Sequence, residues 1–164
     1  MPELDGQHPA QTKTPLAVDL LMARIRQHEG LRLSVYDDAT GKPIVPGSVV
    51  KGIPTIGFGR NLKRGITENE AFFLLTNDVD TVISEVRRAL PWVKDLDHAR
   101  WSVVMEIAYN CGTPGLLEFK RTLGSIKAGD YETAAVQMLE SKWADQVGKR
   151  AITLAEIMRS GEWS

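Results

Sequence analysis

Apolar residues recur at helical spacing between residues 15 and 29, which predicts the first helix. One face collects apolar side chains at intervals of three and four residues: Val18, Leu21, Met22 and Ile25. We expect Thr14 to be the N-cap and Pro15 to occupy the first helical position, where a missing N–H is tolerated. Glu29 continues the apolar face, and Gly30 is a residue that commonly ends a helix. The pattern therefore places a carboxylate in the last turn of the first helix.

Alternating apolar and polar residues over 31–36 predict a strand, and residues 53–59 predict a second strand. Thr67 and Glu70 have the spacing of a capping box, so a long helix is expected to begin there. This helix continues to the turn at residues 90–91. The pattern thus changes from a short β-rich stretch to a long helix at Thr67.

The rest of the chain is helical in pattern. Residues 99–110 are mostly apolar and predict a buried central helix that ends near Gly112. Further helices are expected to start near Gly115, to cover residues 131–143 and to cover residues 152–158.

The order of elements is one helix, a small sheet, a long helix and a set of further helices, which is the α+β class. Residues 1–14 are polar and interrupted by proline, and we expect them to form a disordered arm. Residues 15–164 then form a single domain, with a β-lobe over about 30–66, a linking helix over 67–90 and a helical lobe over 91–164. A cleft is expected between the two lobes.

The chain has 20 basic and 21 acidic side chains, which give a formal net charge of -1. A protein that binds nucleic acid without sequence preference carries a large positive excess, so this class is not expected. The single cysteine, Cys111, can form no intramolecular disulfide, and one thiolate cannot build a cysteine-rich zinc site. We expect no metal or other cofactor. No run approaches the ~20 apolar residues that span a bilayer, and residues 1–15 lack the pattern of a secretory signal.

Glu29 and Asp38 are the candidate pair for chemistry. A carboxylate on an apolar helix face is costly in its charged form, and the helix dipole disfavours an anion in the last turn. Both effects favour a protonated Glu29, as a general acid requires. Hydrolysis of a glycosidic bond needs two carboxyl groups, one to protonate the leaving oxygen and one to orient or activate water. The pattern alone is equally typical of a solvated glutamate and a turn residue, and it does not separate Asp38 from Asp37.

Several motifs surround this pair in order: residues 28–41 (HEGLRLSVYDDATG), 55–62 (TIGFGRNL), 66–71 (ITENEA), 74–80 (LLTNDVD), 109–115 (YNCGTPG), 141–150 (SKWADQVGKR) and 159–163 (RSGEW). Together they resemble the phage-type lysozymes (endolysins, muramidases) of glycoside hydrolase family 24, the family of the T-even phage lysozyme. The resemblance extends from about residue 16 to residue 163. It implies a lysozyme-like fold that hydrolyses the β-1,4 bond between N-acetylmuramic acid and N-acetylglucosamine in bacterial peptidoglycan, for phage-induced lysis of the host cell.

The catalytic signature of this family is a Glu at the end of the first helix, an Asp nine residues later and a Thr that opens a T-I-G-x-G strand. These positions fall on Glu29, Asp38 and Thr55, and the nine-residue spacing selects Asp38 over Asp37. The resemblance implies that Glu29 donates the proton. It also implies that Asp38 and Thr55 hold the attacking water on the opposite face, with inversion at the anomeric carbon.

Other residues match the family at supporting positions. Arg150 would pair with Glu29 and fix its orientation, although without the resemblance it would be a surface cation on a helix. Arg60 stands where the T-even lysozyme has a histidine, and we expect it to form a salt bridge with Asp78. Four residues match substrate-binding positions of the helical lobe: Tyr109, Asn110, Thr122 and Gln137. The first two of these are equally typical of core and helix-end residues.

The segment between Asp38 and Thr55 is roughly ten residues longer than in the T-even lysozyme, and such loops are uncommon unless functional or mobile. Its valines and isoleucines are flanked by Pro and Gly, which prevent one long strand but permit a short ribbon. We expect residues 42–54 to extend the hairpin and to stand at one edge of the cleft. They contain no carboxylate, histidine or cysteine, so they would change how the protein binds glycan without supplying a catalytic group.

Two other functions stay open at this stage. A lytic transglycosylase uses one catalytic Glu and releases a 1,6-anhydro sugar, but it has no water for Asp38 and Thr55 to position. A non-catalytic peptidoglycan-binding module or virion structural domain would be expected to lack Glu29, which is present.

The resemblance also implies where the protein acts. We expect a monomer that stays in the host cytoplasm until a separate holin releases it to the periplasm and cell wall. Its expected partner is peptidoglycan, with no nucleic acid and no stable membrane insertion. A phage or prophage endolysin is the expected origin, and a tail-associated lysozyme is the alternative, less expected for a stand-alone chain of 164 residues.

Overall fold

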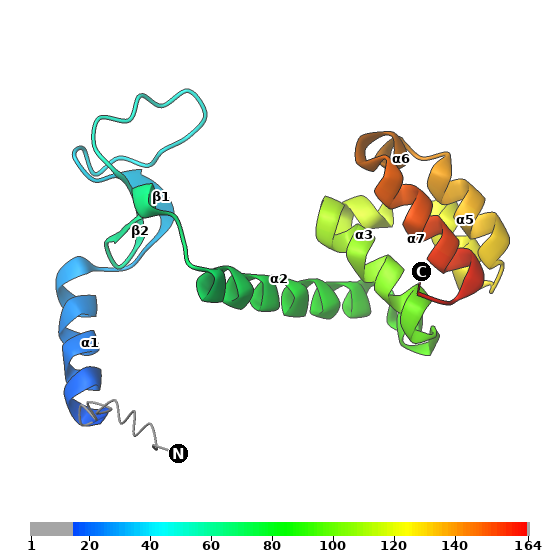
Figure 1. Ribbon diagram of the computed structural model, residues 1–164, viewed down its shortest axis with the longest axis horizontal. Helices are drawn as coiled ribbons and strands as arrows, with labels where there is room; N and C mark the ends of the chain where they lie inside the picture. Colours follow the sequence, from blue (N-terminus) through cyan, green and yellow to red (C-terminus); the bar gives the residue numbers. More distant parts are fainter. Residues whose placement is uncertain (1–14, 164) are drawn as a thin grey trace, which may run out of the picture. The chain divides into compact units, whose positions relative to one another are not determined.

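The computed structural model describes residues 15–163, so the expected arm of residues 1–14 lies outside the described range. The chain divides into two compact units, Met1–Thr67 and Glu68–Ser164. Within the described residues, the first unit holds one α-helix, a short 3-10 helix and a three-stranded antiparallel sheet, and the second unit is helical, which confirms the α+β class (Figure 1). The single domain expected from the sequence stays a prediction. None of the helices within the described range is long and apolar enough to cross a membrane.

The first helix, α1 (Pro15–Glu29), ends where the sequence predicts. Gly30 follows with a φ of 66°, and its N–H donates a 3.1 Å hydrogen bond to the carbonyl of Arg26. A residue with a side chain would be strained in this conformation, so glycine is the natural residue to end the helix. The apolar face of α1 is exposed in this unit, with Leu21 and Met22 each more than half exposed.

Three short strands form the sheet of the first unit: β1 (Arg32–Asp37), β2 (Pro54–Gly57) and β3 (Arg60–Asn61). Their order is β1-β2-β3, and each neighbouring pair is antiparallel. Thr55 lies on the central strand, opposite Tyr36 on one side and Asn61 on the other. A short 3-10 helix, η1 (Leu62–Arg64), follows the last strand. The central position of β2 explains why Thr55 is buried.

The long segment between β1 and β2 begins as an extension of the hairpin. Pro43 forms an isolated bridge with Tyr36, and the N–H of Ile44 donates to the carbonyl of Val35 over 2.9 Å. A turn at residues 45–48 follows, and no strand is found from there to β2. The short ribbon that the sequence predicts is therefore limited to this bridge. The prolines and glycines of the segment account for its irregular course.

The second unit is built from helices. They follow in this order: α2 (Glu68–Ala89), η2 (Pro91–Asp95), α3 (His98–Leu117), α4 (Lys120–Lys127), α5 (Tyr131–Leu139), α6 (Lys142–Val147) and α7 (Lys149–Ser160). The long helix α2 begins after Thr67 and ends before Leu90, as the capping box and the turn predict. Helix α7 packs against α3, α5 and α6, while α2 packs against α3 (Figure 1).

Two helix boundaries differ from the sequence prediction. Gly112 has φ 75° and ψ 158°, so it bends α3, yet helical residues resume directly after it rather than near Gly115. The single helix expected over residues 131–143 is divided into α5 and α6. The division occurs because the Ser141 hydroxyl accepts a hydrogen bond from the N–H of Ala144 and caps a new helix.

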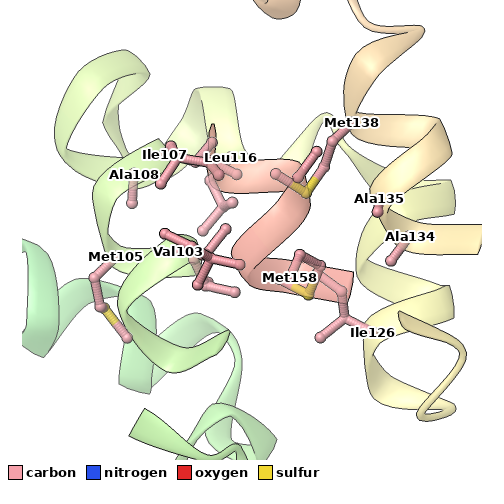
Figure 2. Packing of buried hydrophobic residues seen from close by; sticks show 14 of the residues in the cluster. Val103, Met105, Ile107, Ala108, Leu116, Ile126, Ala134, Ala135, Met138 and Met158 are labelled. Carbon is pink, nitrogen blue, oxygen red and sulfur yellow. The ribbon is translucent and has the colours of Figure 1, made fainter. Parts of the chain in front are cut away.

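The buried apolar core described in the structure lies in the second unit. Met158 of α7 is fully buried and packs near Val103 of α3, Ile126 of α4 and Met138 of α5 (Figure 2). Val86 joins this cluster from α2. The helices of this unit are therefore held together by one shared apolar cluster.

Candidate active site

Glu29 is the last residue of α1, and its carboxylate lies against the turn between β2 and β3. A Cβ placed on Gly59 would be 2.6 Å from Oε2 of Glu29. Gly59 also has a φ of 74°, so both its backbone and the nearby carboxylate favour glycine. The burial that the sequence suggests for Glu29 is not seen in this unit, where its side chain is exposed. The reason is that the apolar face of α1 on which it lies is itself exposed here.

Asp38 follows β1 and is exposed, and its contacts are with Ile53. The N–H of Ile53 donates a 2.6 Å hydrogen bond to Oδ1 of Asp38, and the N–H of Asp38 donates to the carbonyl of Ile53 over 3.1 Å. One carboxylate oxygen is thereby held by the backbone. This leaves Oδ2 as the oxygen that can act as an acceptor for a bound molecule.

Thr55 is 5% exposed and lies two residues beyond Ile53. Its hydroxyl donates a 3.0 Å hydrogen bond to the carbonyl of Ile53, which also accepts from the N–H of Asp38. The first unit therefore brings Asp38 and Thr55 together through the peptide groups of one residue. A carboxylate and a hydroxyl are both groups that can form a hydrogen bond with a small ligand such as water.

Asp37 is 4% exposed, in contrast to its exposed neighbour Asp38. Its carboxylate accepts hydrogen bonds from three backbone N–H groups, those of Ala39, Lys51 and Gly52, over 2.8–3.0 Å. The Lys51 N–H is the main cause that holds the pKa of Asp37 below its ordinary value, and burial opposes this effect. The two acids therefore differ: the buried carboxylate of Asp37 accepts hydrogen bonds from the backbone, whereas the side chain of Asp38 is exposed to solvent.

A pocket of about 660 Å³ adjoins this part of the first unit. Its lining runs from the β2–β3 turn through η1 to the end of the unit: Phe58, Gly59, Arg60, Asn61, Arg64, Gly65, Ile66 and Thr67. Because a Cβ on Gly59 would meet the Glu29 carboxylate, this part of the pocket lining lies close to the expected acid. Among residues 15–163 there is no group of three or more His, Cys, Asp or Glu side chains that could hold a metal ion.

Thr122 and Gln137 lie together in the second unit, in a pocket of about 450 Å³ between α4 and the start of α6. Trp143 lines the same pocket and is 5% exposed. The Oε1 of Gln137 accepts a 3.2 Å hydrogen bond from the hydroxyl of Ser125. The pocket is lined by polar side chains and by two aromatic residues, Phe119 and Trp143, and a role of Thr122 and Gln137 in substrate binding stays a prediction.

Tyr109 and Asn110 are both exposed near the middle of α3. The Oδ1 of Asn110 accepts a 2.9 Å hydrogen bond from the indole N–H of Trp143. Tyr109 instead lines an apolar groove of about 210 Å³ between α2 and α3, together with Val79 and Val82. The two residues thus contact different surroundings, and their role in substrate binding stays a prediction.

Arg150 and Arg60 have contacts within their own units. The Nε of Arg150 donates a 2.8 Å hydrogen bond to Oε1 of Glu106, with both side chains partly exposed. The guanidinium of Arg60 donates to the carbonyl of Gly65 over 3.3 Å. Asp78 is exposed on α2. The expected pairs of Arg150 with Glu29 and of Arg60 with Asp78 each join residues of different units and stay predictions.

Sequence reasoning did not assign three residues that shape the site: Gly52, Ile53 and Gly59. A Cβ on Gly52 would overlap Oδ1 of Asp38, so this glycine is needed for the backbone to approach the carboxylate. A signal was present in the sequence, because each glycine lies next to or within the predicted second strand, where glycine often marks a close approach.

Comparisons with known proteins identify the family of the chain. A model of the phage lysozyme family matches residues 26–159, a range that includes Glu29, Asp38 and Thr55. The chain therefore belongs to the phage lysozyme family. The chain is also 26% identical to the pre-baseplate central spike protein Gp5 of Enterobacteria phage T4, over 84% of this chain and 27% of that protein. It thus spans about a quarter of the length of this curated relative.

Proposed function

We propose that this chain is a muramidase of glycoside hydrolase family 24 that cuts the β-1,4 bond between N-acetylmuramic acid and N-acetylglucosamine. The observation that carries the proposal is that the side chains of Asp38 and Thr55 both form hydrogen bonds with the backbone of Ile53. It is supported by Glu29, which lies at the end of α1 against the neighbouring turn. Family membership adds support, since the matched range takes in all three residues.

In the proposed mechanism, Glu29 protonates the glycosidic oxygen as its bond to the anomeric carbon breaks. Oδ2 of Asp38 accepts a proton from the attacking water, which the Thr55 hydroxyl helps to orient on the opposite face of the sugar. Water then adds to the anomeric carbon of N-acetylmuramic acid with inversion. The leaving sugar departs with a hydroxyl at C4. Each cut thus breaks one glycosidic bond and consumes one water.

The remaining assignments belong to the same proposal. Arg150 would pair with Glu29, Arg60 would pair with Asp78, and the pocket of Thr122 and Gln137 would hold part of the substrate. The segment of residues 42–54 would border the cleft and change the affinity for glycan. The start of this segment is held by the bridge between Pro43 and Tyr36. A segment held in this way is better suited to form a fixed border of the cleft than a freely moving loop is.

A lytic transglycosylase is the nearest alternative reaction. Its 1,6-anhydro product forms when the sugar's own C6 hydroxyl attacks, so the enzyme needs no bound water. Asp38 and Thr55, both hydrogen-bonded to Ile53, support the hydrolase, because a carboxylate and a hydroxyl are groups that can position water.

In the cell, we propose that the protein acts as a monomeric endolysin, made in the host cytoplasm and released to the cell wall by a separate holin. A second candidate is a lysozyme carried in the virion. The specific observation that favours it is the similarity to a protein named as a central spike. Retention of Glu29 speaks against a purely structural role.

The experiment that tests the proposal is turbidity clearing of permeabilised Gram-negative cells by the wild type and by Glu29→Gln. We expect the wild type to clear the suspension and Glu29→Gln to lose activity by at least about a hundredfold, as for removal of a general acid. Circular dichroism should show that the variant is folded. A folded and fully active Glu29→Gln protein would overturn the mechanism.

A further inference from the structure

The inference concerns Asp37, the acidic residue that the mechanism does not use. It is buried although it is charged, and backbone N–H groups compensate the charge. Oδ1 accepts from Ala39 over 3.0 Å and from Gly52 over 2.9 Å, while Oδ2 accepts from Lys51 over 2.8 Å. Several N–H donors on one carboxylate make strong, charge-assisted hydrogen bonds. Both oxygens of Asp37 are therefore engaged in holding the chain.

These hydrogen bonds join segments that are distant in sequence. Lys51 and Gly52 lie 14 and 15 residues beyond Asp37, at the far end of the long segment that connects β1 to β2. Closing a flexible segment of this length has an entropic cost, which the carboxylate helps to offset. Asp37 thus fastens the end of the segment to its beginning.

The next residue after this attachment is the one that holds the proposed catalytic groups. Ile53 follows Gly52 directly, its N–H donates to Oδ1 of Asp38, and its carbonyl accepts from the Thr55 hydroxyl. A shift of the chain at Gly52 would be passed to Ile53 through a single planar peptide group. The positions of Asp38 and Thr55 therefore depend on how firmly Gly52 is held.

We propose that Asp37 is a positioning residue of the active site, which orients Asp38 and Thr55 by fixing the backbone of residues 51–53. This inference rests on the proposed muramidase function. The two adjacent acids then have different roles. Asp38 contacts the attacking water, whereas Asp37 acts through the backbone and does not contact the substrate. Asp37 is not a substitute for Asp38, because its two oxygens are already hydrogen-bonded and buried.

The test is steady-state kinetics of Asp37→Asn on soluble peptidoglycan fragments, at a temperature where circular dichroism shows the protein folded. The amide keeps the size of the side chain but replaces one acceptor oxygen with a donor. We expect kcat to fall on the order of ten- to a hundredfold with little change in KM, as for a small displacement of catalytic groups. Asp130→Asn is the matched control, since Asp130 accepts from the N–H of Thr133 at the start of α5 and should leave kcat unchanged.

A double-mutant cycle separates positioning from a general loss of structure. If Asp37 acts through Asp38, the Asp37→Asn change should lower residual activity much less in an Asp38→Asn background than in the wild type. Equal fold losses in both backgrounds, or an unchanged kcat in folded Asp37→Asn, would overturn the inference. Asp37→Ala, which removes both acceptors, should lose more activity than Asp37→Asn, which keeps one, and failure of both variants to fold would also count against a positioning role.

These outcomes are distinct from failure of the proposed function. A wild-type protein that released nothing from peptidoglycan would refute the muramidase proposal itself. An active wild type with a fully active Asp37→Asn variant would refute only the role of Asp37.

Discussion

The N–H of Ile53 donates a hydrogen bond of 2.6 Å to Oδ1 of Asp38. This contact exists because the preceding residue is glycine. A Cβ on Gly52 would overlap the same carboxylate oxygen and would lie 2.7 Å from both the nitrogen and the Cβ of Ala39. The orientation of the proposed water-binding carboxylate therefore depends on a position where no side chain fits.

We expect Gly52→Ala to displace Asp38 and to lower kcat by about a hundredfold for a shift of roughly 1 Å. The free energy of unfolding should fall by about 1–3 kcal/mol, as at other overpacked positions. Gly124→Ala is the control, because nothing lies within 4 Å of a Cβ there and alanine favours the helix α4. Urea unfolding and peptidoglycan kinetics measure the two effects. Wild-type kcat in Gly52→Ala would contradict the proposed role of this contact.

A second substitution tests the surroundings of Glu29. A Cβ in Gly59→Ala would be 2.6 Å from Oε2 of Glu29, the mobile end of a side chain that can move away. Gly57→Ala is a close match, since Gly57 has φ 68° against 74° for Gly59 but nothing within 4 Å of its Cβ. We expect both variants to lose similar stability through backbone strain, of about 1–3 kcal/mol.

The two variants should differ in activity. Gly59→Ala should lose kcat because the proposed acid is displaced, whereas Gly57→Ala should keep most of it. The comparison is made by reducing-sugar release at a temperature where both proteins are folded. Equal activities in the two variants would mean that the carboxylate does not act from its position beside Gly59.

A third prediction concerns pH. The pKa of Asp37 is held below its ordinary value, chiefly by the N–H of Lys51. A carboxyl group with a lowered folded pKa stabilises the fold above its unfolded value of ~3.9, and the contribution is lost as pH falls through the folded value. The stability difference between wild type and Asp37→Asn should therefore be complete near neutral pH and should shrink below pH ~4. Thermal unfolding measured across this range by circular dichroism checks it, and a difference that did not change with pH would argue against the assignment.

Several helix boundaries in both units could be predicted from local pattern. The end of α1 at Glu29 follows from an apolar face and a glycine, and the start of α2 after Thr67 follows from a capping box. Both depend on residues close in sequence, where spacing determines structure. The functions proposed for Asp38 and Thr55 came from a resemblance, because spacing alone left Asp37 and Asp38 equivalent.

The rest required long-range contacts that no local pattern encodes. The carboxylate of Asp37 accepts hydrogen bonds from the N–H groups of Lys51 and Gly52, which lie 14 and 15 residues further along a segment of irregular backbone. A helix end was expected near Gly112, yet helical residues resume directly after the bend there. The exposure of Glu29 likewise depends on which surfaces cover the apolar face of α1, and the amphipathic pattern does not specify them.

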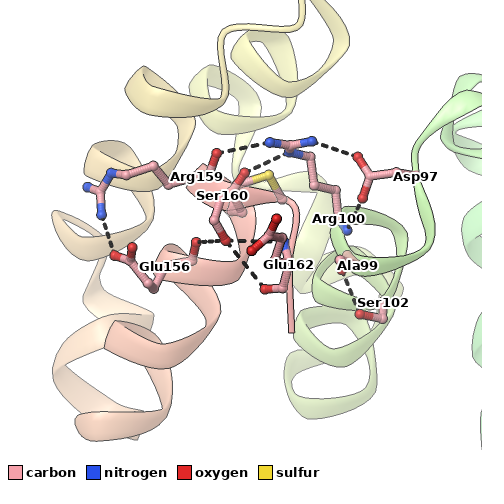
Figure 3. A network of polar contacts seen from close by, with 9 residues as sticks. Asp97, Ala99, Arg100, Ser102, Glu156, Arg159, Ser160 and Glu162 are labelled. Carbon is pink, nitrogen blue, oxygen red and sulfur yellow. Dashed lines mark hydrogen bonds and ion pairs between the residues drawn. The ribbon is translucent and has the colours of Figure 1, made fainter. Parts of the chain in front are cut away.

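In the second unit, Arg100 joins α3 to the end of α7 (Figure 3). Its guanidinium donates to the carbonyls of Met158 and Arg159 over 2.8 and 2.9 Å and lies 3.8 Å from the ring centre of Tyr131. It also pairs with Asp97. We expect Arg100→Lys to lower the free energy of unfolding by about 1–3 kcal/mol, since an ammonium cannot satisfy both helix-end carbonyls and the stacking contact.

The matched control for Arg100 is Arg159→Lys. The Arg159 side chain is 35% exposed and pairs with the exposed Glu132 and Glu156, so its replacement should change stability by about 1 kcal/mol or less. Urea unfolding followed by tryptophan fluorescence compares the two. If both substitutions had the same small effect, the buried contacts of Arg100 would not be a main link between α3 and α7.

The most direct test of the central claim is the mass of the fragments that the wild-type protein releases from purified peptidoglycan. A hydrolase in which Asp38 and Thr55 position water adds one water at each cut. We therefore predict muropeptides that end in a reducing N-acetylmuramic acid. Fragments one water lighter, ending in a 1,6-anhydro sugar, would identify a transglycosylase and contradict the proposed roles of Asp38 and Thr55, and the absence of any released fragment would contradict catalysis altogether.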